Sequence, residues 1–337
     1  MKINRLVIEN FKSIERIELI EPNPFTVFVG PNGSGKSNIF EALEFVNSYT
    51  RVYPSEAVRL FGGTEKLTNR GNKTAKSFRF DSSFDSFPHT AFISHDFRNK
   101  AALESKGIPG ARERGQGSPI FVQDGERWRT SATDQFFYRF LRLFVGNRDT
   151  LRFPYQDEIS LDLAATNLEP VLKRILTSPL LRDEIFEWLE LFIPGFKAVE
   201  VDDRDELHWF ENSSSEYFTK DLISDGTYNI LALLTAVYQS DDKPQFLCIE
   251  EPENGLHPQV AGELVDFFRI MCEERGHYIW LNTHSQSMAS RVRPNEFVVV
   301  EKKDGATTTR QFRNEDFNGM RVDEAWLTNA LNGGLAW

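Results

Sequence analysis

The chain has 337 residues, of which 40% are hydrophobic, and a formal net charge of −11. This acidic balance argues against a protein that binds nucleic acid through a uniformly basic surface. Two cysteines, Cys248 and Cys272, are too few for a disulfide framework, and the six histidines show no zinc-binding spacing. The composition therefore predicts a reduced, cytoplasmic protein with one large domain or two closely packed lobes.

The N-terminal segment predicts three strands and a helix. Residues 2–10 and 14–20 alternate between apolar and polar side chains and are joined at Phe11-Lys12-Ser13. The apolar run at residues 25–29 predicts a third strand, and apolar residues at three- and four-residue spacing predict a helix over residues 36–49.

A glycine-rich loop lies between the third strand and the helix. It has the pattern G-x-x-x-x-G-K-S from Gly30 to Ser37. Strand, glycine loop and helix form the context of a phosphate-binding loop, in which backbone N–H groups and the helix N-terminus surround phosphate oxygens. In such a loop Lys36 reaches the β- and γ-phosphates and the Ser37 hydroxyl is a ligand of Mg²⁺. The sequence thus predicts binding of a nucleoside triphosphate.

The segment from Arg51 to Arg152 is basic, although the rest of the chain is acidic. It has 18 lysines and arginines against 11 aspartates and glutamates, an excess of seven positive charges. Strands are predicted over residues 77–84, 90–97 and 119–128, as an antiparallel meander. The segment is either a solvated insert or a contact surface for DNA or protein, with Arg112, Arg114 and Lys73 as candidate contacts.

The remaining predicted elements alternate between helices and strands. An aromatic and aliphatic run over residues 134–145 includes Arg139 and Arg142 and predicts no particular element. Later residues predict helices at 167–176, 180–192, 227–238, 258–274 and 286–292, and strands at 196–201, 207–210, 216–218, 245–249, 277–281, 297–301 and 307–312, the last two as a hairpin around Asp304-Gly305.

Two adjacent carboxylates, Glu250 and Glu251, follow the predicted strand at residues 245–249. A buried apolar strand is typical of the centre of a parallel sheet, whose strands end at the site. One acid is expected to position Mg²⁺ or its water, and the other to orient and activate the attacking water. The alternative is a strand end capped by solvated acids.

Two further motifs carry candidate site residues. His284, in Leu281-Asn-Thr-His-Ser285, follows the next predicted strand and is expected to contact the γ-phosphate or the attacking water, unless it is structural. Ser224-Asp-Gly-Thr227 precedes a helix, where it is either an N-cap or an anion site made from a hydroxyl and helix amides.

These motifs, in this order, resemble the ATPase head of ABC-type proteins, and more closely the group that includes RecF, SMC and the overcoming-lysogenization-defect (OLD) proteins. Asn10-Phe11-Lys12-Ser13 resembles the opening of that group, and Gly30–Ser37 the Walker A loop. Ser224–Thr227 resembles the signature motif, Glu250-Glu251 the Walker B pair and His284 the switch histidine. The strings S-D-G-T, E-E-P-E-N-G-L-H-P and T-H-S are most similar to small, free-standing bacterial ATPases.

The sequence departs from the usual ABC pattern in several places. The signature reads S-D-G-T rather than S-G-G-Q, and Glu250 stands where ABC enzymes usually have aspartate. The Q-loop glutamine is not assigned among Gln123, Gln135 and Gln156. No coiled-coil heptads and no second acidic cluster are found, so we expect neither SMC arms nor the Toprim nuclease of OLD proteins.

The resemblance implies an α/β P-loop NTPase fold with a mixed central sheet, an antiparallel β-meander and a helical lobe. It implies one ATPase head over residues 1–337, with N-terminal strands and Walker A at 1–50, a basic insert at 51–130, a helical lobe at 131–220 and the remaining motifs at 221–337. It implies ATP and Mg²⁺ as cofactors. The catalytic residues are then Lys36, Glu251 and His284, the metal ligands Ser37 and Glu250, and the nucleotide contacts Lys12, Asn32, Gly33, Ser34, Gly35, Lys36, Ser37, Asn38, Ser224 and Gly226.

The resemblance also implies a head-to-head homodimer in which the signature of one subunit caps the γ-phosphate held by the other. Three functions are then open: a DNA-directed ATPase in phage defence or RecF-type repair, a scaffold that holds and releases a separately encoded nuclease or toxin, and a transporter subunit. The atypical signature argues against the transporter. We expect a defence function, with no membrane contact.

Overall fold

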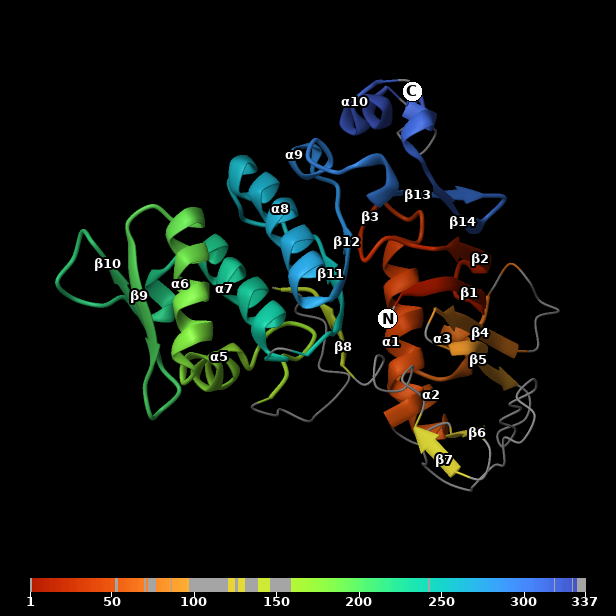
Figure 1. Ribbon diagram of the computed structural model, residues 1–337, viewed down its shortest axis with the longest axis horizontal. Coiled ribbons are helices and arrows are strands. Elements are labelled where there is room, and N and C mark those ends of the chain that lie inside the picture. Colours follow the sequence, from red (N-terminus) through yellow and green to blue (C-terminus); the bar gives the residue numbers. More distant parts are fainter. Residues whose placement is uncertain are drawn as a thin grey trace. The chain divides into compact units, whose positions relative to one another are not determined.

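The computed structural model describes residues 2–51, 54–69, 71, 77–85, 87–96, 121–124, 127–130, 139–145, 159–241, 243–317, 319–328 and 330–331. These residues form two compact units (Figure 1). Unit 1 comprises residues 1–140 and 292–337, and unit 2 comprises residues 141–291. Among the described residues, no helix is both long and apolar enough to cross a membrane.

Unit 1 contains a four-stranded antiparallel sheet in the order β2-β1-β4-β5. Its strands are β1 (Ile3–Phe11), β2 (Ile14–Ile20), β4 (Ser77–Phe84) and β5 (Phe87–Asp96). Phe11 and Phe78 from this sheet pack on Phe45 of α1 (Lys36–Arg51), with ring centroids 6.0 and 5.3 Å from Phe45. This aromatic cluster fixes the turn between β1 and β2 beside the helix that follows the glycine loop.

A second sheet segment in unit 1 precedes the glycine loop. Strand β3 (Phe25–Val29) is buried at every residue and pairs in parallel with β13 (Phe297–Lys303). Strand β14 (Ala306–Gln311) pairs antiparallel with β13, so the order is β14-β13-β3 and the sheet is mixed. The other helices among the described residues of unit 1 are α2 (Pro54–Leu60), α3 (Thr64–Leu67) and α10 (Val322–Leu327), with short 3₁₀ turns at Pro294–Glu296 and Asn314–Phe317.

Unit 2 contains the strands that lead to the predicted acids. Strands β11 (Phe246–Glu250) and β12 (Tyr278–Asn282) are parallel and buried at every residue, with Glu250 opposite Asn282. Strand β8 (Phe140–Leu143) lies on the other side of β11. Because strands with both faces covered are apolar, β11 and β12 are continuous apolar runs until their last residues, Glu250 and Asn282.

Helices and one hairpin form the rest of unit 2 as far as the structure describes it (green to blue in Figure 1). Helix α7 is buried at every residue from Asn229 to Tyr238 and packs against α5 and α6, while Trp188 of α6 contacts Phe267 of α8 with ring centroids 4.7 Å apart. The elements are α5 (Leu168–Leu176), α6 (Pro179–Phe192), β9 (Phe196–Val201), β10 (Leu207–Glu211), a 3₁₀ turn (Lys220–Leu222), α7 (Asp225–Tyr238), α8 (Pro258–Arg275) and α9 (Gln286–Ala289).

Most predicted elements agree with the structure, two predicted strands differ, and helices α2, α3 and α10 and strand β8 were not predicted. The strand predicted at residues 119–128 is instead two paired strands, β6 (Phe121–Asp124) and β7 (Arg127–Thr130), because a Asp124-Gly125 turn signal interrupts it. Residues 216–218 make only an isolated bridge through Phe218. Strand β8 was not predicted, since four residues are too few for a periodic signal.

Some predictions concern residues outside the described parts of the chain. Lys73, Arg112 and Arg114 of the basic segment are among them, as are Gln135 and Gln156. The predicted division of one ATPase head at residues 50, 130 and 220 stays a prediction. Cys248 and Cys272 are both buried, and neither forms a disulfide bond.

Candidate nucleotide site

The loop Gly30–Ser37 connects β3 to α1 and needs glycine at two positions. Gly30 and Gly35 have φ values of +153° and +104°. A Cβ atom on Gly30 would lie 2.0 Å from the Val300 carbonyl oxygen of β13, and one on Gly35 would lie 2.1 Å from Thr307 Oγ1 of β14. Both distances are shorter than any real contact, so the loop can pack this closely on the hairpin only with glycine at these positions.

Polar groups of the loop are arranged around its backbone. Lys36 Nζ donates hydrogen bonds to the carbonyl oxygens of Gly30 at 2.8 Å and Pro31 at 3.3 Å. The Ser34 hydroxyl is buried and has no hydrogen-bond partner among the described residues. A buried unpaired hydroxyl is costly, and a phosphate oxygen is a suitable acceptor for it. The solvent-exposed residues here are Asn32, Gly33 and Ser37.

A network of side-chain hydrogen bonds joins the glycine loop to β14 and to the β1–β2 turn. Thr307 Oγ1 donates to the Ser34 carbonyl oxygen at 2.8 Å and lies 2.6 Å from Ser13 Oγ. Asn38 Nδ2 donates to Ser13 Oγ at 2.6 Å. The β1–β2 turn, the loop and β14 are therefore tied together. Sequence reasoning assigned Asn38 to nucleotide contact and did not single out Thr307.

Lys12, also predicted to contact nucleotide, lies in the β1–β2 turn with a φ of +49°. Its ammonium group forms an ion pair with Glu41, a buried residue of α1. This pair joins the turn to the helix that begins at the loop. A nucleotide contact by Lys12 stays a prediction.

In unit 2, Glu250 ends β11 as a buried carboxylate. Arg142 of β8 donates from Nε to Glu250 Oε1 at 2.5 Å, and its Nη2 contacts the same oxygen. Asn282, at the end of β12, donates from Nδ2 to Glu250 Oε2 at 3.2 Å. Both carboxylate oxygens therefore have donors, one from the strand on each side.

Glu251 begins the loop after β11 in an unusual backbone conformation. Its φ is +47°, in the left-handed region that L residues rarely occupy. Its N–H donates to both the carbonyl oxygen and Oδ1 of Asn282, at 3.0 and 3.1 Å. The side chain accepts a hydrogen bond from Asn254 Nδ2 at 3.1 Å. The side chain of Glu251 is partly exposed, whereas that of Glu250 is buried.

A third carboxylate, Glu253, joins this loop to His284. Glu253 Oε1 accepts hydrogen bonds from Thr283 Oγ1 at 2.6 Å and from the His284 N–H at 3.0 Å. Its Oε2 is buried without a hydrogen-bond partner among the described residues. Burial raises the pKa of the Glu253 carboxyl above its ordinary value. His284 is exposed, and the hydrogen bond from its N–H to Glu253 holds the His284 backbone in place.

Ser224, in the predicted signature motif, is the N-cap of α7. Its Oγ accepts a hydrogen bond from the Thr227 N–H at 3.0 Å. Ser224 is exposed, and Leu222 two residues earlier is 68% exposed. The cap interpretation is therefore correct, and it leaves the anion-site interpretation open because the helix N-terminus faces solvent.

The first turn of α7 packs on the loop after β11. A Cβ atom on Gly226 would lie 2.4 Å from the Gly255 carbonyl oxygen. Asn229 Nδ2 donates to the carbonyl oxygens of Pro252 at 3.2 Å and Asn254 at 2.8 Å. The signature helix and the loop that begins with Glu251 are thus one packed assembly within unit 2.

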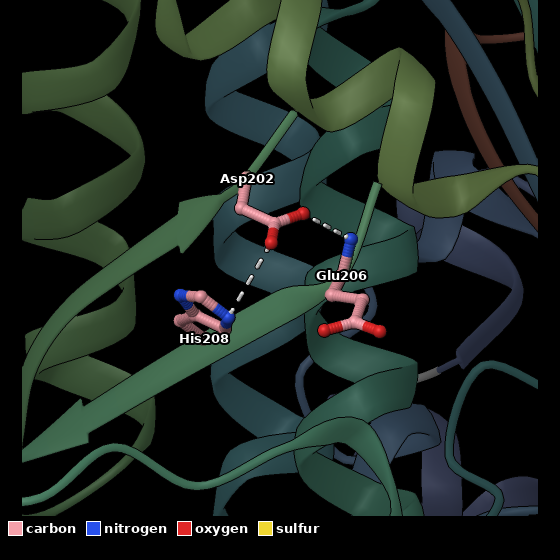
Figure 2. A group of neighbouring side chains, drawn as sticks. All are labelled: Asp202, Glu206 and His208. Atoms are coloured by element: carbon pink, nitrogen blue, oxygen red, sulfur yellow. Dashed lines mark hydrogen bonds and ion pairs between the residues drawn. The ribbon is translucent and has the colours of Figure 1, made fainter. Parts of the chain in front are cut away.

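A separate group of potential metal ligands lies on the β9–β10 hairpin (Figure 2). Asp202 Oδ1 accepts hydrogen bonds from the N–H groups of Arg204 and Glu206 at 2.8 and 2.9 Å. These bonds lower the pKa of Asp202. The His208 ring stacks on Tyr217 with centroids 4.0 Å apart. The hydrogen bonds of Asp202 explain the group as part of the turn that joins β9 to β10.

The structure therefore brings the predicted residues together in two sets. In unit 1 the Walker A residues form the loop between β3 and α1. In unit 2 Glu250, Glu251 and His284 lie at or just after the ends of the neighbouring strands β11 and β12. Sequence reasoning missed Arg142, Asn282, Glu253 and Thr307. Of these, Asn282 and Glu253 lie inside quoted motifs, where a polar residue at a strand end is a usable signal, whereas Arg142 and Thr307 gave none.

A family model described as "AAA domain, putative AbiEii toxin, Type IV TA system" matches residues 25–288. The chain belongs to this AAA domain family. The matched range of the AAA domain includes the glycine loop of unit 1 and the acids of unit 2. A P-loop ATPase family implies nucleotide binding, as the sequence predicted.

Curated relatives match only a short part of the chain. The chromosome partition protein Smc of Methanocaldococcus jannaschii is 43% identical over 60 residues, which are 18% of this chain and 5% of that protein. Structural maintenance of chromosomes protein 1 of Arabidopsis thaliana is 52% identical over 46 residues, 13% of this chain and 4% of that protein. The similarity thus covers a small fraction of these longer proteins.

Solved structures of SMC heads are similar in fold to most of this chain. The head bound to the C-winged helix domain of ScpA has a TM-score of 0.64 at 17% identity, covering 94% of this chain and 98% of the other. The head from Thermotoga maritima has a TM-score of 0.54 at 15% identity, covering 93% and 100%. The predicted fold class, an α/β P-loop NTPase similar to an SMC head with a mixed sheet and antiparallel strands, is therefore confirmed.

Proposed function

We propose that the protein is a molecular switch that binds and hydrolyses ATP, dimerises head-to-head when ATP is bound, and controls a DNA-directed or effector-associated process in bacterial defence against phage. The observation that carries the proposal is the loop Gly30–Ser37, packed on β13 and β14 at the N-terminus of a helix. Family membership supports the same conclusion, because one family model includes both the loop and the acids of unit 2.

The residues present fit ATP and Mg²⁺. The orphaned Ser34 hydroxyl is a donor for a phosphate oxygen, and the backbone N–H groups of Asn32, Gly33 and Gly35 are further candidates. Lys36 neutralises phosphate charge. The resemblance assigns Ser37 and Glu250 as the residues that would hold Mg²⁺, directly or through its water, and the ion would supply positive charge next to the phosphates. Oxygen donors of this kind are those that Mg²⁺ prefers.

Glu251 and His284 perform the hydrolytic step in this proposal. Glu251 is partly exposed and held by its backbone, so its carboxylate is placed to accept a proton from water. His284 contacts the γ-phosphate, and Glu253 fixes the backbone from which the imidazole projects. Lys12 and Asn38 complete the nucleotide contacts predicted from the resemblance.

Dimerisation is proposed through the exposed edge at Ser224. In the resembling ABC group the signature serine caps the γ-phosphate of the other subunit, and here Ser224 and Gly226 begin a helix at an exposed surface. Leu222 adds an exposed apolar side chain to this edge. The solved SMC head bound to ScpA is a precedent for a second protein on a head of this fold.

A second candidate function is a scaffold that sequesters a separately encoded nuclease or toxin and releases it on a trigger. The family description, which names a toxin–antitoxin system, favours an effector of this kind. A repair ATPase of RecF type is the third candidate. Binding of duplex DNA to the basic segment would favour the first and third candidates over the scaffold.

The test is the mass in solution of a Glu251→Gln variant, which we expect to retain ATP. Light scattering should give a mass near 38.8 kDa without nucleotide and twice that value with ATP and Mg²⁺. Glu251→Gln combined with Lys36→Ala is the matched control and should stay monomeric. A monomer at saturating ATP in the single variant would contradict the proposed switch.

Adding duplex DNA to the same samples tests the DNA-directed alternative. If the basic segment contacts phosphates, DNA should tighten the ATP-dependent dimer. The logarithm of the affinity for DNA should then fall linearly with the logarithm of the salt concentration. A constitutive oligomer that responds to neither ATP nor DNA would favour the scaffold.

A further inference from the structure

The hydroxyl of Thr307, in β14, contacts the backbone of the glycine loop. Thr307 is 1% exposed, and its Oγ1 lies 2.8 Å from the carbonyl oxygen of Ser34. Its N–H donates to the Ser13 carbonyl oxygen at 2.8 Å, so the backbone of β14 determines where this hydroxyl lies. All three residues belong to unit 1. The β13–β14 hairpin is therefore attached to the loop at Ser34 itself.

The hydrogen bonds around Thr307 can run in only one direction. A carbonyl oxygen only accepts, so Thr307 uses its single hydroxyl proton on Ser34. Ser13 Oγ, 2.6 Å from Thr307 Oγ1, must then donate to Thr307. Because the Ser13 proton is used in this way, Ser13 Oγ accepts from Asn38 Nδ2, also at 2.6 Å. The chain of hydrogen bonds thus runs from Asn38 through Ser13 and Thr307 to the Ser34 carbonyl oxygen.

The bond from Thr307 determines the orientation of the peptide group between Ser34 and Gly35. This peptide is trans, so its C=O and N–H point in opposite directions. With the Ser34 carbonyl oxygen held by Thr307, the Gly35 N–H points away from β14. No described residue accepts a hydrogen bond from this N–H. The N–H is therefore available to an acceptor on the side of the loop opposite β14.

Glycine at position 35 lets both hydroxyls approach the loop this closely. A Cβ atom on Gly35 would lie 2.1 Å from Thr307 Oγ1 and 2.8 Å from Ser13 Oγ. The two hydroxyls therefore occupy the space that a side chain would need. The side of Gly35 that a side chain would occupy faces the hairpin and the β1–β2 turn.

We propose that Thr307 is a positioning residue for the nucleotide, and that its hydroxyl orients the Gly35 N–H to donate a hydrogen bond to a phosphate oxygen. The inference rests on the proposed function, since it requires a nucleotide at the loop Gly30–Ser37. It gives a role to a residue that lies 273 positions from Ser34 and outside every motif. A charged acceptor such as phosphate gains more from an oriented N–H than a neutral acceptor does.

Calorimetric titration with ADP and Mg²⁺ tests the affinity, because ADP carries phosphates but lacks the γ-phosphate whose hydrolysis would complicate the titration. Thr307→Ala leaves the Ser34 carbonyl oxygen without its donor and should weaken ADP binding about tenfold, as expected for one hydrogen bond to a charged group. Thr307→Ser keeps the hydroxyl and should bind ADP as tightly as the unmodified parent chain. If Thr307→Ala does not fold, Thr307→Cys, whose thiol is a weak donor, takes its place.

Gln311, in the same strand, provides the matched control. Its side chain donates to the carbonyl oxygen of Ile20 at 2.9 Å and accepts from the Ile20 N–H at 2.8 Å, so it also joins β14 to β2. Gln311→Ala should lower the melting temperature without changing the affinity for ADP. An equal loss of affinity in Gln311→Ala and Thr307→Ala would mean that any weakening of the hairpin has this effect, and it would overturn the specific role of Thr307.

The Gly35 amide can be observed by itself in a nuclear magnetic resonance experiment. Ser34-Gly35 is the only Ser-Gly step in the sequence, so cell-free synthesis with carbonyl-¹³C serine and ¹⁵N glycine labels this one peptide bond on both sides. Saturating ADP should move the amide proton resonance in the parent and in Thr307→Ser, and should move it less in Thr307→Ala. Equal shifts and equal affinities in the parent and Thr307→Ala would overturn the inference.

Failure of the proposed function gives a different result. If the parent binds no ADP, or binds it equally well after Lys36→Ala, then the nucleotide site itself is wrong. If ADP binding depends on Lys36 and Thr307→Ala binds ADP as tightly as the parent, then only the role of Thr307 is wrong.

Discussion

Glu251 combines a strained backbone with the side chain proposed to activate water. In the left-handed region its Cβ crowds the following carbonyl oxygen, at a cost of roughly 1–2 kcal/mol for an L residue. The hydrogen bonds from its N–H to Asn282 hold this conformation. Strain of this kind is found at functional sites, where the surrounding structure maintains it.

Replacing Glu251 with glycine should therefore stabilise the protein while abolishing ATP turnover. Glycine adopts a φ of +47° without the Cβ contact, so we expect a gain of about 1 kcal/mol in the free energy of unfolding. Urea denaturation and phosphate release measure the two effects. Glu251→Ala is the control, because it lacks the carboxylate but keeps Cβ. A glycine variant no more stable than the alanine variant would show that the strain is absent.

At the scale of elements, the loop after β11 connects three parts of unit 2. It begins at Glu251, packs under the first turn of α7 through Gly255, and reaches the His284 backbone through Glu253. A carboxylate that accepts two hydrogen bonds with one oxygen is a strong tie, because bonds to charged acceptors are shorter and stronger than neutral ones.

Removing this tie should lower turnover more than stability. In Glu253→Ala the His284 backbone loses its acceptor, and we expect phosphate release to fall about tenfold, since a misplaced catalytic group is costly. Glu253→Gln keeps an oxygen that can accept both hydrogen bonds and should retain most of the activity. If both variants are equally impaired, the charge of Glu253 matters rather than its position.

The elements themselves were largely predictable. Long periodic segments such as α8 and continuous apolar strands such as β11 and β12 have strong local signals. Strand β8 has none, because it is four residues long and interrupted by Arg142. The support that β14 gives to the glycine loop joins residues 13 and 307, which are 294 positions apart. No local pattern reports such a contact.

At the scale of the whole molecule, the sequence predicted the motifs of the site and not the residues that hold them. Glu250 and His284 were singled out as candidates because acids and a histidine after apolar strands are recognisable patterns. Their supports, Arg142 and Glu253, depend on which strands and loops become neighbours. Tertiary packing decides this, and it overrides the local patterns on which sequence reasoning relies.

Global stability should depend on one buried histidine. His277 has no exposed surface, and its Nδ1 accepts a hydrogen bond from the Gln245 N–H at 3.3 Å. Burial, helped by the charge of Arg275, lowers the pKa of His277 to about 4. Because the unfolded chain binds this proton near pH 6.5, the stability is complete above that pH and is lost as the pH falls towards 4.

Between pH 7.5 and pH 5 this linkage should remove about 2 kcal/mol of stability. Replacing His277 with asparagine, which keeps an acceptor but has no proton to bind, should make urea denaturation less dependent on pH by that amount. Ile279→Val, in the neighbouring strand β12, is the control, because it changes no titratable group and should keep the pH dependence of the parent. Equal pH dependence in the His277 variant would show that the imidazole is protonated without cost.

The close approach of Gly226 to Gly255 constrains how this sequence can evolve. The two glycines lie in different motifs. A Cβ atom on Gly226 would nevertheless lie only 2.4 Å from the Gly255 carbonyl oxygen, so the residue at position 226 must stay small as long as the loop keeps its place at position 255. A side chain at position 226 is compatible only with a loop displaced at position 255, so changes at the two positions should be inherited together. Homologues that have lost the small residue at one position should therefore show a changed loop length or composition at the other.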